Sequence, residues 1–524
     1  MVEKTKQFRA PGGPGAAGPA PGAPGAAGPA AGAPSAAGPG AGAPAGAPAP
    51  SARAAAEDET AFVAAYLERA RKAQAAVANY TQEQIDELCL SVGWEVYNDE
   101  NIARLAALAV EVTEMGNVPD KITKHKVKVL GVLDDIRHAK SVGLIERDEA
   151  KGISKYAKPV GVVGALLPVT NPTATPASNG LGILKGRNAV IFAPHPRGAA
   201  ASRLAVEYMR KGLRRVGAPE DLVQIIEEPS IPRTNELMRQ VDLVLATGGG
   251  AMVKAAYSSG TPSYGVGPGN AVQIIAEDAD LNDAVAKIAM SKAFDYATSC
   301  SSENSVIIHS SLYDQAVARF QEAEQTYLIT GSEREKLEGW MWRPNKKGKI
   351  ALNPAIVARS AVKIATDAGL SVPEETRILL VEGTMPLEED RFADEKLSPV
   401  LTVYSYDTFE EAVDILTRLT DNAGTGHSCG IHTYRREYIE ALGMRMRTSR
   451  IMVRQAQAPA NGGNFFNGMP STVTLGCGTW GGNITTENIH WKHFINVTWV
   501  SEPFEPKRPS DEEIWGGFWE RYKR

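Results

Sequence analysis

The stretch Gly265-Val266-Gly267-Pro268-Gly269 separates two halves of the chain that show the same pattern. In each half, short β-branched and apolar runs alternate with small-residue turns and with stretches that are compatible with helices. Strands that alternate with helices predict βαβ units and a mostly parallel sheet. The simplest account is an α/β protein with two α/β domains that meet at this glycine-rich crossover.

The expected strands are short and fall into two sets. The first set covers residues 160–167, 189–192, 222–226 and 243–246, and the second covers residues 272–276, 305–308, 378–381, 400–404, 431–433 and 451–453. Ahead of them, apolar residues recur at helical spacing between residues 57 and 118, which predicts amphipathic helices. Thr81 and Gln84 have the spacing of a capping box at the start of one of these helices.

Residues 10–56 consist almost wholly of Ala, Gly and Pro. Glycine recurs at every third position only in patches, which excludes a collagen triple helix. Such a composition buries too little apolar surface to offset the entropy of ordering, so we expect residues 1–56 to be a disordered tail. Residues 1–9 are expected to be a frayed terminus, with a short docking peptide as the alternative.

The chain ends in a charged, proline-containing tail over residues 503–524. Ser510 and Glu513 have capping-box spacing, which predicts a short helix there. The aromatic residues of this helix share one face: Trp515, Phe518, Trp519 and Tyr522. We expect the helix to dock on its own subunit or on a neighbour, and the alternative is insertion into a groove of a partner.

The composition excludes several classes of protein. The 524 residues carry 56 Lys and Arg against 61 Asp and Glu, a formal net charge of −5, so no basic surface for nucleic acid is indicated. The longest apolar stretch, residues 159–169, is much shorter than the roughly 20 residues that a membrane helix needs. Four cysteines are too few for a disulfide scaffold and suit a reducing compartment. We therefore expect a cytoplasmic protein that has no secretory signal and acts on neither membranes nor nucleic acid.

Two residues in small-residue loops carry candidate chemistry. Cys300 lies among hydroxyl residues just ahead of a predicted strand, although a cysteine considered alone is more often a buried apolar residue than a nucleophile. Cys429 and Cys477 remain rival nucleophiles. Asn171 stands between prolines at the end of an apolar strand, where it is either an aimed amide donor or part of a simple β-turn.

Glycine-rich turns indicate a ligand. Thr247, Gly248 and Gly249 end a predicted strand and open a helix, an arrangement in which backbone N–H groups can approach a phosphate. As a lone motif this is weak, because the full Gly-x-Gly-x-x-Gly spacing is missing. The loop over residues 474–483 indicates unusual backbone angles or close approach to a ligand.

No metal site is expected. Two pairs of histidines are close in the sequence, His427 with His432 and His490 with His493. No cysteine or carboxylate cluster completes either pair to a ligand set.

Taken together, these motifs resemble the aldehyde dehydrogenase family, and within it the branch that transfers the acyl group to coenzyme A. The resemblance runs from about residue 57 to 503 and rests on the combination of motifs at residues 170–172, 193–197, 246–249, 265–270, 300–303, 395–399, 426–428 and 475–480. Residues 426–433 and 487–496 are most similar to the acylating sulfoacetaldehyde dehydrogenases.

The resemblance implies the aldehyde dehydrogenase fold, with two Rossmann-like α/β domains and a β oligomerisation arm, preceded by the disordered Ala/Gly/Pro-rich tail. It places a cofactor-binding domain at residues 57–265 with the arm at about 144–158, a catalytic domain at 266–475, a return segment with the oligomerisation strand at 476–502, and the C-terminal tail at 503–524. Pairing of the arm across subunits predicts a homodimer or a homotetramer.

The resemblance also implies the catalytic residues. Cys300 matches the nucleophile, which forms a thiohemiacetal with the aldehyde and, after hydride transfer to the nicotinamide, a thioester. Asn171 and the backbone N–H of Cys300 match the donors that hold the developing oxyanion. His427 matches a histidine that assists proton transfer in the acylating branch, and a purely structural polar role is the alternative.

The implied cofactor is NAD or NADP. The residues that match its binding site are Thr170, Pro194, His195, Arg197, Thr247, Gly248, Gly249, Glu395 and Pro399. Among these, Glu395 matches the residue that hydrogen-bonds the nicotinamide ribose. The run 193–197 contains no acid but contains Arg197, which suits a 2′-phosphate, so NADP is plausible and NAD stays open.

Val266 stands where the hydrolytic relatives carry the glutamate that activates water. Without this general base, hydrolysis of the thioester is expected to be slow, whereas a thiol is a better nucleophile than water and needs less help. We therefore predict coenzyme A as the co-substrate and an acyl-CoA as the product.

The finer resemblance favours sulfoacetaldehyde as the substrate, with acetaldehyde and propionaldehyde as competitors. Sulfoacetaldehyde requires an anion site near Cys300, for which Arg454 is a candidate; a surface or interface role is the alternative for this arginine. Some acylating relatives are packaged in bacterial microcompartments, so the two termini suggest a shell-protein partner and a location inside such a compartment. A non-catalytic scaffold of the same fold is the contrary hypothesis, against which intact Cys300, Asn171 and Glu395 argue.

Overall fold

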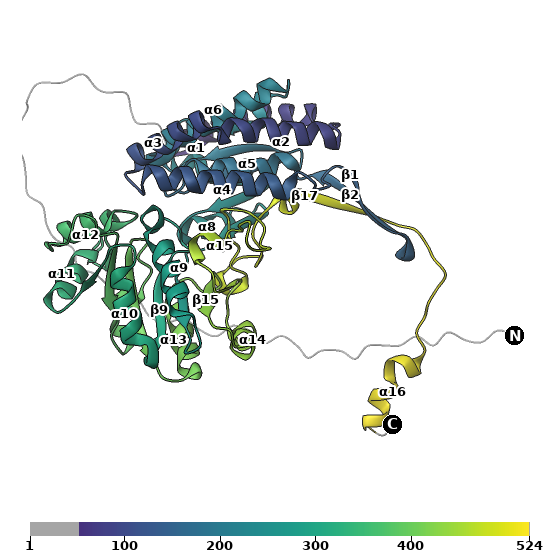
Figure 1. The fold of residues 1–524 in the computed structure, drawn as a ribbon. Coiled ribbons are helices and arrows are strands. Elements are labelled where there is room, and N and C mark those ends of the chain that lie inside the picture. Colours follow the sequence, from purple (N-terminus) through teal and green to yellow (C-terminus); the bar gives the residue numbers. More distant parts are fainter. Residues whose placement is uncertain (1–51, 523–524) are drawn as a thin grey trace, which may run out of the picture. The chain divides into compact units, whose positions relative to one another are not determined.

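The computed structural model describes residues 52–522, with side chains from residue 58 onward (Figure 1). The predictions of a disordered tail and of a docking peptide or frayed end concern mainly residues 1–51 and lie outside the described residues. α1 (Ala52–Ala76) begins a little ahead of residue 57, where ordered structure is expected to begin. In the described part of the chain, no helix combines the length and the apolar character needed to cross a membrane.

A five-stranded parallel sheet has the strand order β5-β4-β3-β6-β7. Its strands are β3 (Val162–Leu166), β4 (Ala189–Ala193), β5 (Val223–Ile225), β6 (Leu243–Thr247) and β7 (Ser263–Val266). Every residue of the three central strands is buried, as is typical of a parallel sheet covered on both faces.

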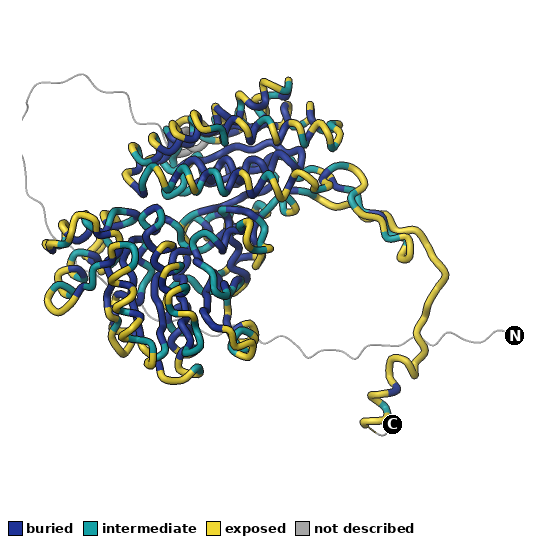
Figure 2. The backbone as a smooth tube through the Cα atoms, viewed as in Figure 1, coloured by how far each residue is buried: buried dark blue, intermediate teal, exposed yellow. Residues whose placement is uncertain are grey.

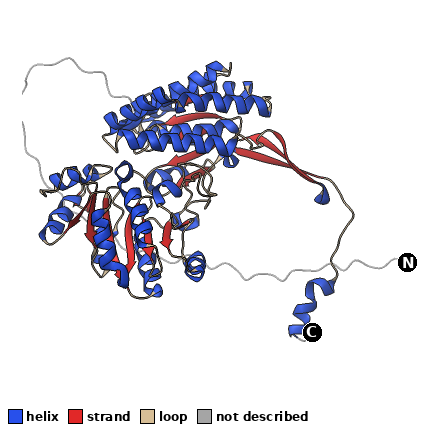
Figure 3. Ribbon diagram, viewed as in Figure 1, coloured by secondary structure: helices blue, strands red, loops and turns tan. Residues whose placement is uncertain are grey.

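Helices cover both faces of this sheet (Figure 3). α5 (Ala174–Lys185) and α6 (Ala199–Arg215) connect β3 to β4 and β4 to β5, and right-handed crossovers place α7 (Ile231–Gln240) and α8 (Gly250–Tyr257) on the opposite face. α2 (Gln82–Tyr97), α3 (Asp99–Thr113) and α4 (Val118–Ile136) form an outer layer on α5 and α6. The capping box predicted at α2 is confirmed, because Gln84 N–H donates to Thr81 Oγ1 and Thr81 N–H donates to Gln84 Oε1.

A second, seven-stranded parallel sheet has the order β10-β13-β14-β9-β8-β15-β16. Its strands are β8 (Ala271–Ile275), β9 (Glu303–His309), β10 (Thr326–Ile329), β13 (Ile378–Glu382), β14 (Val400–Tyr406), β15 (Cys429–His432) and β16 (Ile451–Val453). The helices of this half are α9 (Leu281–Ala293), α10 (Tyr313–Glu322), α11 (Ser332–Met341), α12 (Ala361–Asp367), α13 (Phe409–Asn422), α14 (Arg436–Arg445) and α15 (Gln457–Ala460), with a small hairpin of β11 (Trp342–Pro344) and β12 (Ile350–Leu352). The glycine-rich stretch joins the two sheets, because β7 ends at Val266 and β8 begins at Ala271.

A three-stranded antiparallel sheet in the order β1-β2-β17 forms the arm. Its strands are β1 (Gly143–Asp148), β2 (Ile153–Pro159) and β17 (Ile495–Ser501), and β17 pairs with β2 along its whole length. Unlike the two parallel sheets, whose central strands are buried, β17 is mostly exposed (Figure 2). After it, α16 (Asp511–Tyr522) begins directly behind Ser510, whose backbone N–H donates to Glu513 Oε2 at 2.7 Å while Glu513 N–H donates to Ser510 Oγ at 3.2 Å.

Candidate active site

The loops that carry the candidate residues meet between the edges of the two parallel sheets. Asn171 follows β3 and Thr247 ends β6, so both lie at the carboxyl edge of the five-stranded sheet. Cys300 precedes β9, Glu395 precedes β14 and His427 precedes β15, so these three lie at the amino edge of the seven-stranded sheet. All five residues line one cavity of about 900 Å³. Both sheets thus contribute to a single candidate site.

Cys300 and His427 form a close pair. Sγ of Cys300 lies 3.2 Å from Nε2 of His427, and Nδ1 of His427 lies 2.8 Å from Oγ of Ser428. Both contacts are satisfied when His427 donates through Nδ1 to Ser428 and accepts the Cys300 thiol through Nε2. The imidazole is therefore placed to take the thiol proton as the sulfur attacks a carbonyl carbon.

Burial keeps this pair neutral. Burial, together with the positive charge of Arg450, which acts in the same direction, lowers the pKa of His427 to about 3. Burial also raises the pKa of the Cys300 thiol to about 12, with Glu395 and Cys477 contributing in the same direction. The resting pair is a thiol beside a neutral imidazole, so its proton transfer accompanies the attack on the substrate instead of preceding it.

The structure separates Cys300 from the rival cysteines. All four cysteines lie in the described part of the chain, and among them only Cys300 is partly exposed and lines the cavity. Cys89 and Cys429 are buried, and burial raises the pKa of each to about 12. Cys477 is also buried, with Sγ 3.5 Å from the carbonyl oxygen of Leu475. The geometry therefore favours Cys300 as the nucleophile.

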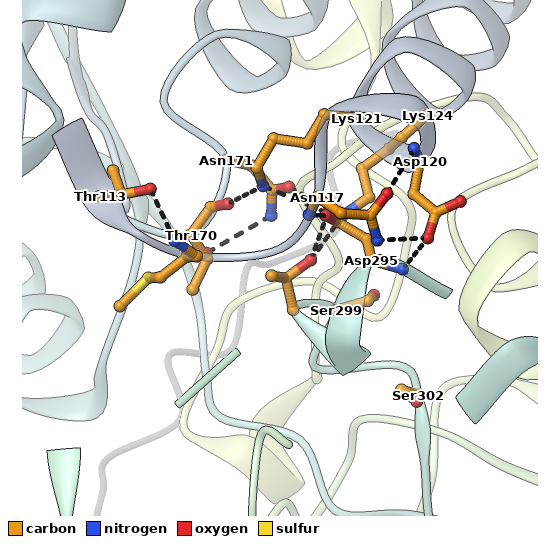
Figure 4. Close-up of polar contacts among 12 residues, drawn as sticks. Thr113, Asn117, Asp120, Lys121, Lys124, Thr170, Asn171, Asp295, Ser299 and Ser302 are labelled. Carbon is orange, nitrogen blue, oxygen red and sulfur yellow. Dashed lines mark hydrogen bonds and ion pairs between the residues drawn. The ribbon is translucent and has the colours of Figure 1, made fainter. Parts of the chain in front are cut away.

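Asn171 contacts a lysine that the sequence alone does not single out. Nζ of Lys124, on α4, donates to Asn171 Oδ1 at 3.1 Å. Lys124 also donates to the carboxylate of Asp295, which is shared with Lys121 (Figure 4). The sequence offers no direct signal for this cluster, because Asp295 lies far along the chain from α4 and outside the motifs of the resemblance. The amide nitrogen of Asn171 is left free of Lys124.

Glu395 presents an unused acceptor inside the site. Its buried Oε1 has no hydrogen-bond partner among the described residues. Burial raises the pKa of this carboxyl to about 8, while the backbone N–H of Gly269 acts in the opposite direction. A buried polar atom without a partner is costly, and a ribose hydroxyl group of a dinucleotide would satisfy it. Glu395 thus fits the cofactor role that the resemblance implies.

The turn after β6 fits a phosphate group. Gly248 and Gly249 line the cavity, and α8 begins at Gly250. A Cβ added at Gly249 would meet nothing within 4 Å, so the space beside this backbone is open. Open backbone at the positive end of a helix suits the pyrophosphate of a dinucleotide.

Four other residues matched to the cofactor site divide into two groups. Thr170 and His195 line the cavity. Pro194 is buried directly after β4, and the buried Pro399 accepts the backbone N–H of Leu379 at 2.9 Å, so neither proline belongs to the cavity lining. A part of these two prolines in cofactor binding stays a prediction.

Arg197 also lies outside the cavity lining. Its Nη2 donates to the carbonyl oxygen of Thr113 at 2.6 Å and lies 4.0 Å from the carboxylate of Glu114. Contact with a 2′-phosphate would require this guanidinium to change partners. The role of Arg197 in cofactor choice therefore stays a prediction.

Val266 forms part of the cavity wall and is 7% exposed. Among the described residues that line the cavity, Glu395 is the only one with a carboxyl group. The wall thus contains no second carboxylate that could activate a water molecule where Val266 stands.

Arg454 lines the same cavity as Cys300. Its Nη1 donates to the carbonyl oxygen of Thr433 at 2.6 Å, at the carboxyl end of β15, whereas His427 precedes the amino end of that strand. From residue 427 to residue 433, extended chain covers roughly 20 Å at ~3.3 Å per residue. The role of Arg454 as an anion site for the substrate therefore stays a prediction.

The second histidine pair has a carboxylate neighbour after all. The ligand atoms of Glu487, His490 and His493 lie within 4.8 Å of one another, and His493 Nε2 lies 3.3 Å from Glu487 Oε2. The expectation that no carboxylate completes this pair is therefore wrong, because the turn ahead of β17 folds Glu487 back over the histidines. The absence of a bound metal stays a prediction.

The chain is similar in sequence and in structure to known proteins. The model of the aldehyde dehydrogenase family matches residues 49–474. A sulfoacetaldehyde dehydrogenase of Acholeplasma sp is 66% identical over 453 residues, which cover 86% of this chain and 93% of the relative. A sulfoacetaldehyde dehydrogenase (acylating) of Bilophila wadsworthia is 62% identical over 460 residues, 88% of this chain and 99% of the relative. The crystal structure of an acetylating aldehyde dehydrogenase from Geobacillus thermoglucosidasius superimposes with a TM-score of 0.82 at 36% identity, covering 87% of this chain and 100% of the other.

Proposed function

Because the chain belongs to the aldehyde dehydrogenase family, we propose that it oxidises sulfoacetaldehyde to the coenzyme A thioester with NAD(P)+ as the oxidant. The relatives named as sulfoacetaldehyde dehydrogenases support the substrate, and the acylating one supports the transfer to coenzyme A. The observation that carries the proposal is the Cys300–His427 pair in a cavity whose wall has Val266 in place of a water-activating glutamate.

The residues of the chain account for formation of the acyl-enzyme. His427 Nε2 takes the thiol proton as Sγ of Cys300 bonds to the aldehyde carbon, and the amide of Asn171 with the backbone N–H of Cys300 holds the oxygen that becomes negative. Bound NAD(P)+ supplies the hydride acceptor, and Glu395 with the turn at residues 248–249 would hold it. Loss of the hydride leaves a thioester on Cys300.

Transfer to coenzyme A uses the same pair. After His427 has released its proton to solvent, Nε2 takes the proton of the coenzyme A thiol as this sulfur attacks the thioester carbon. The C–S bond to Cys300 then breaks, and His427 returns the proton to Sγ of Cys300. Water is a poorer competitor, because no carboxylate near Val266 can take its proton.

The charge of the cavity supports an acidic aldehyde. Lys128 and Arg454 line it without a carboxylate partner among the described residues, whereas Lys124 and Lys287 are paired with Asp295 and Asp283. Because burial raises the pKa of Glu395 to about 8, this carboxyl is largely neutral at neutral pH. These two unpaired cations favour a sulfonate and also the phosphates of coenzyme A, whereas a neutral aldehyde gains nothing from them.

A steady-state assay of NADH and NADPH formation tests the proposal. Sulfoacetaldehyde with coenzyme A should give rapid turnover, and omission of coenzyme A should lower the rate by at least tenfold. Propionaldehyde, a neutral aldehyde of similar length, serves as the competing substrate and should give a lower kcat/KM. Equal rates with and without coenzyme A would contradict the acylating reaction, and higher kcat/KM for propionaldehyde would contradict the substrate.

The arm and the C-terminal helix suggest how subunits associate. β17 lies at the edge of its sheet and exposes Val497, Trp499 and Val500, which supports a homodimer or homotetramer formed by pairing of this edge. α16 exposes the aromatic rings of Trp515 and Phe518, which supports docking on a shell protein of a bacterial microcompartment. Deletion of residues 510–524 should abolish co-purification with such a shell protein, and unchanged co-purification would exclude this helix as the contact.

A further inference from the structure

Oxyanion stabilisation by Asn171 depends on which way its side-chain amide points. The NH₂ end donates hydrogen bonds and stabilises a negative oxygen, whereas the carbonyl end would repel it. The two ends have nearly the same shape, so packing alone distinguishes them poorly. Something in the site has to select the orientation.

Lys124 selects it. An ammonium group has three N–H donors and no acceptor, so the end of Asn171 that faces Nζ at 3.1 Å must be the carbonyl oxygen Oδ1. The NH₂ end then turns away from α4, and its one contact among the described residues is a long one of 3.4 Å to Oγ1 of Thr170. This long contact leaves the NH₂ group free to donate to a substrate oxygen.

The ammonium is itself fixed at all three donors. Besides Asn171, it donates to Oγ1 of Thr298 at 2.6 Å and to Oδ2 of Asp295. Thr298 in turn donates to Asp295 Oδ2 at 2.6 Å, so the four side chains form a closed cluster beside Cys300. Figure 4 shows Lys124 and Lys121 reaching from α4 towards Asp295 on one side and Asn171 on the other.

Asp295 is placed to keep this cluster charged. Its side chain is fully buried, and although burial pushes its pKa upward, the charges of Lys124 and Lys121 hold the pKa below the usual value. Its backbone has the left-handed φ of 50°, which ordinary residues adopt rarely, and the N–H of Asn117 donates to its Oδ1 at 3.1 Å. A buried and anchored carboxylate gives Lys124 one fixed position.

We propose that Lys124, fixed by Asp295 and Thr298, is a positioning residue that turns the NH₂ group of Asn171 toward the aldehyde oxygen on Cys300. The inference rests on the proposed function, since it concerns the same oxyanion. Lys124 touches neither the substrate nor the cofactor in this role and acts through Asn171.

The variant Lys124→Met tests this role in two backgrounds. In the wild-type background, kcat should fall by about 10²-fold, as for the loss of one oxyanion donor, while KM for the cofactor stays within about threefold. In the Asn171→Ala background, which has already lost the donor, Lys124→Met should lower kcat by less than about threefold. Equal losses in both backgrounds would overturn the proposal, because Lys124 would then act independently of Asn171.

Lys121→Met is the matched control. Lys121 lies on the same helix and contacts the same carboxylate at 3.3 Å, but it donates to the backbone carbonyl of Thr170 and not to Asn171. It should lower the melting temperature about as much as Lys124→Met does and lower kcat far less. If Lys121→Met lowered kcat as much as Lys124→Met does, the loss of any ion pair with Asp295 would be enough to slow the reaction. This result would contradict positioning through Asn171.

Two further measurements keep the outcome clear. If Lys124→Met does not fold, Lys124→Arg keeps the charge next to Asp295 and is measured in the same two backgrounds, with the same criterion of unequal losses. The wild-type enzyme is assayed alongside with and without coenzyme A. A wild type without coenzyme A-dependent activity would refute the proposed function, whereas an active wild type with an equally active Lys124→Met would refute the positioning role alone.

Discussion

Cys300 starts the reaction as a protonated thiol, because burial raises its pKa to about 12 and lowers the pKa of His427 to about 3. Between pH 6 and 9 the thiolate fraction therefore increases steadily with pH, and His427 stays neutral. We expect the rate of alkylation of Cys300 by iodoacetamide in the free enzyme to rise throughout this range without a plateau. A plateau with an apparent pKa below 8 would show a preformed thiolate and contradict the neutral pair.

Val266 decides between water and coenzyme A. The variant Val266→Glu places a carboxylate in the cavity wall where the hydrolytic relatives carry their general base, so coenzyme A-independent turnover should rise by at least tenfold. The measurement is NAD(P)H formation without coenzyme A, together with detection of the free acid. Val266→Gln, which has nearly the same shape and no base, is the control and should stay at the wild-type level; an equal rise in both variants would assign the effect to size.

At the scale of single residues, the sequence predicts those site residues that belong to recognisable motifs. Cys300, Asn171 and His427 all line the cavity, and Cys300 and His427 make the contact that catalysis requires. Lys124 and Asp295 could not be predicted, because their contact joins α4 to a left-handed residue 171 positions further along the chain. Such a pairing depends on how α4 packs against the second half of the chain, which local patterns do not contain.

The helix α4 carries a second cation into the cavity, Lys128. Its Nζ donates to the carbonyl oxygens of Gly462 and Gly463 at 2.8 and 3.0 Å, and it forms no ion pair with a carboxylate of the described residues. Burial, with a smaller contribution from the nearby charge of Lys124, lowers the pKa of Lys128 to about 7. Lys128 is therefore charged below about pH 7 and becomes neutral as the pH rises through this value.

This titration predicts a pH-dependent substrate preference. The ratio of kcat/KM for sulfoacetaldehyde to that for propionaldehyde should fall by severalfold as the pH rises from 6 to 8.5. In Lys128→Met the ratio should be low and independent of pH, while Arg454→Met, which removes a guanidinium held by the carbonyl oxygen of Thr433, should behave like the wild type. A pH-independent ratio in the wild type, or a loss of preference only in Arg454→Met, would contradict a role of Lys128 in the preference for the acidic aldehyde.

Among the elements, the strands of the two parallel sheets are well predicted, because β3, β4, β6, β13 and β14 are apolar runs bounded by turns. β7 and β10 escape prediction for different reasons. β7 contains Gly265 of the crossover, which weakens its strand character, and β10 is a four-residue strand at the edge of its sheet. Pairing with a neighbouring strand stabilises both: β7 pairs with β6, the strand before it in the chain, and β10 pairs with β13, about 50 residues further along.

For the whole molecule, the exposed edge of the arm makes a prediction about assembly. Trp499 on β17 is 62% exposed. Among the described residues, the only cation that lies over its ring is Lys155 of the neighbouring strand. The double variant Val497→Lys/Trp499→Lys should shift the mass measured by mass photometry towards the monomer, because charged side chains oppose edge pairing. Met444→Lys, at an 87% exposed apolar position on α14, is the control; the same mass for the arm variant and the wild type would exclude this edge as the interface.

The order of domains along the chain follows from the sequence through the resemblance, and the two parallel sheets do meet at the predicted crossover. The functions assigned to the two domains stay predictions. What the sequence cannot supply is the way in which loops from opposite edges of the two sheets close around one cavity, since this depends on packing between elements far apart in the chain.

The most direct test of the account is peptide mass spectrometry of enzyme mixed with sulfoacetaldehyde and NAD(P)+ in the absence of coenzyme A. The sulfoacetyl group should accumulate on the peptide that contains Cys300 and disappear within seconds when coenzyme A is added, with sulfoacetyl-CoA as the product. If Cys300 stays unmodified while NAD(P)H continues to form, the reaction does not pass through a thioester on this residue. If water removes the adduct as fast as coenzyme A does, the site can hydrolyse the thioester. Either result would contradict the account.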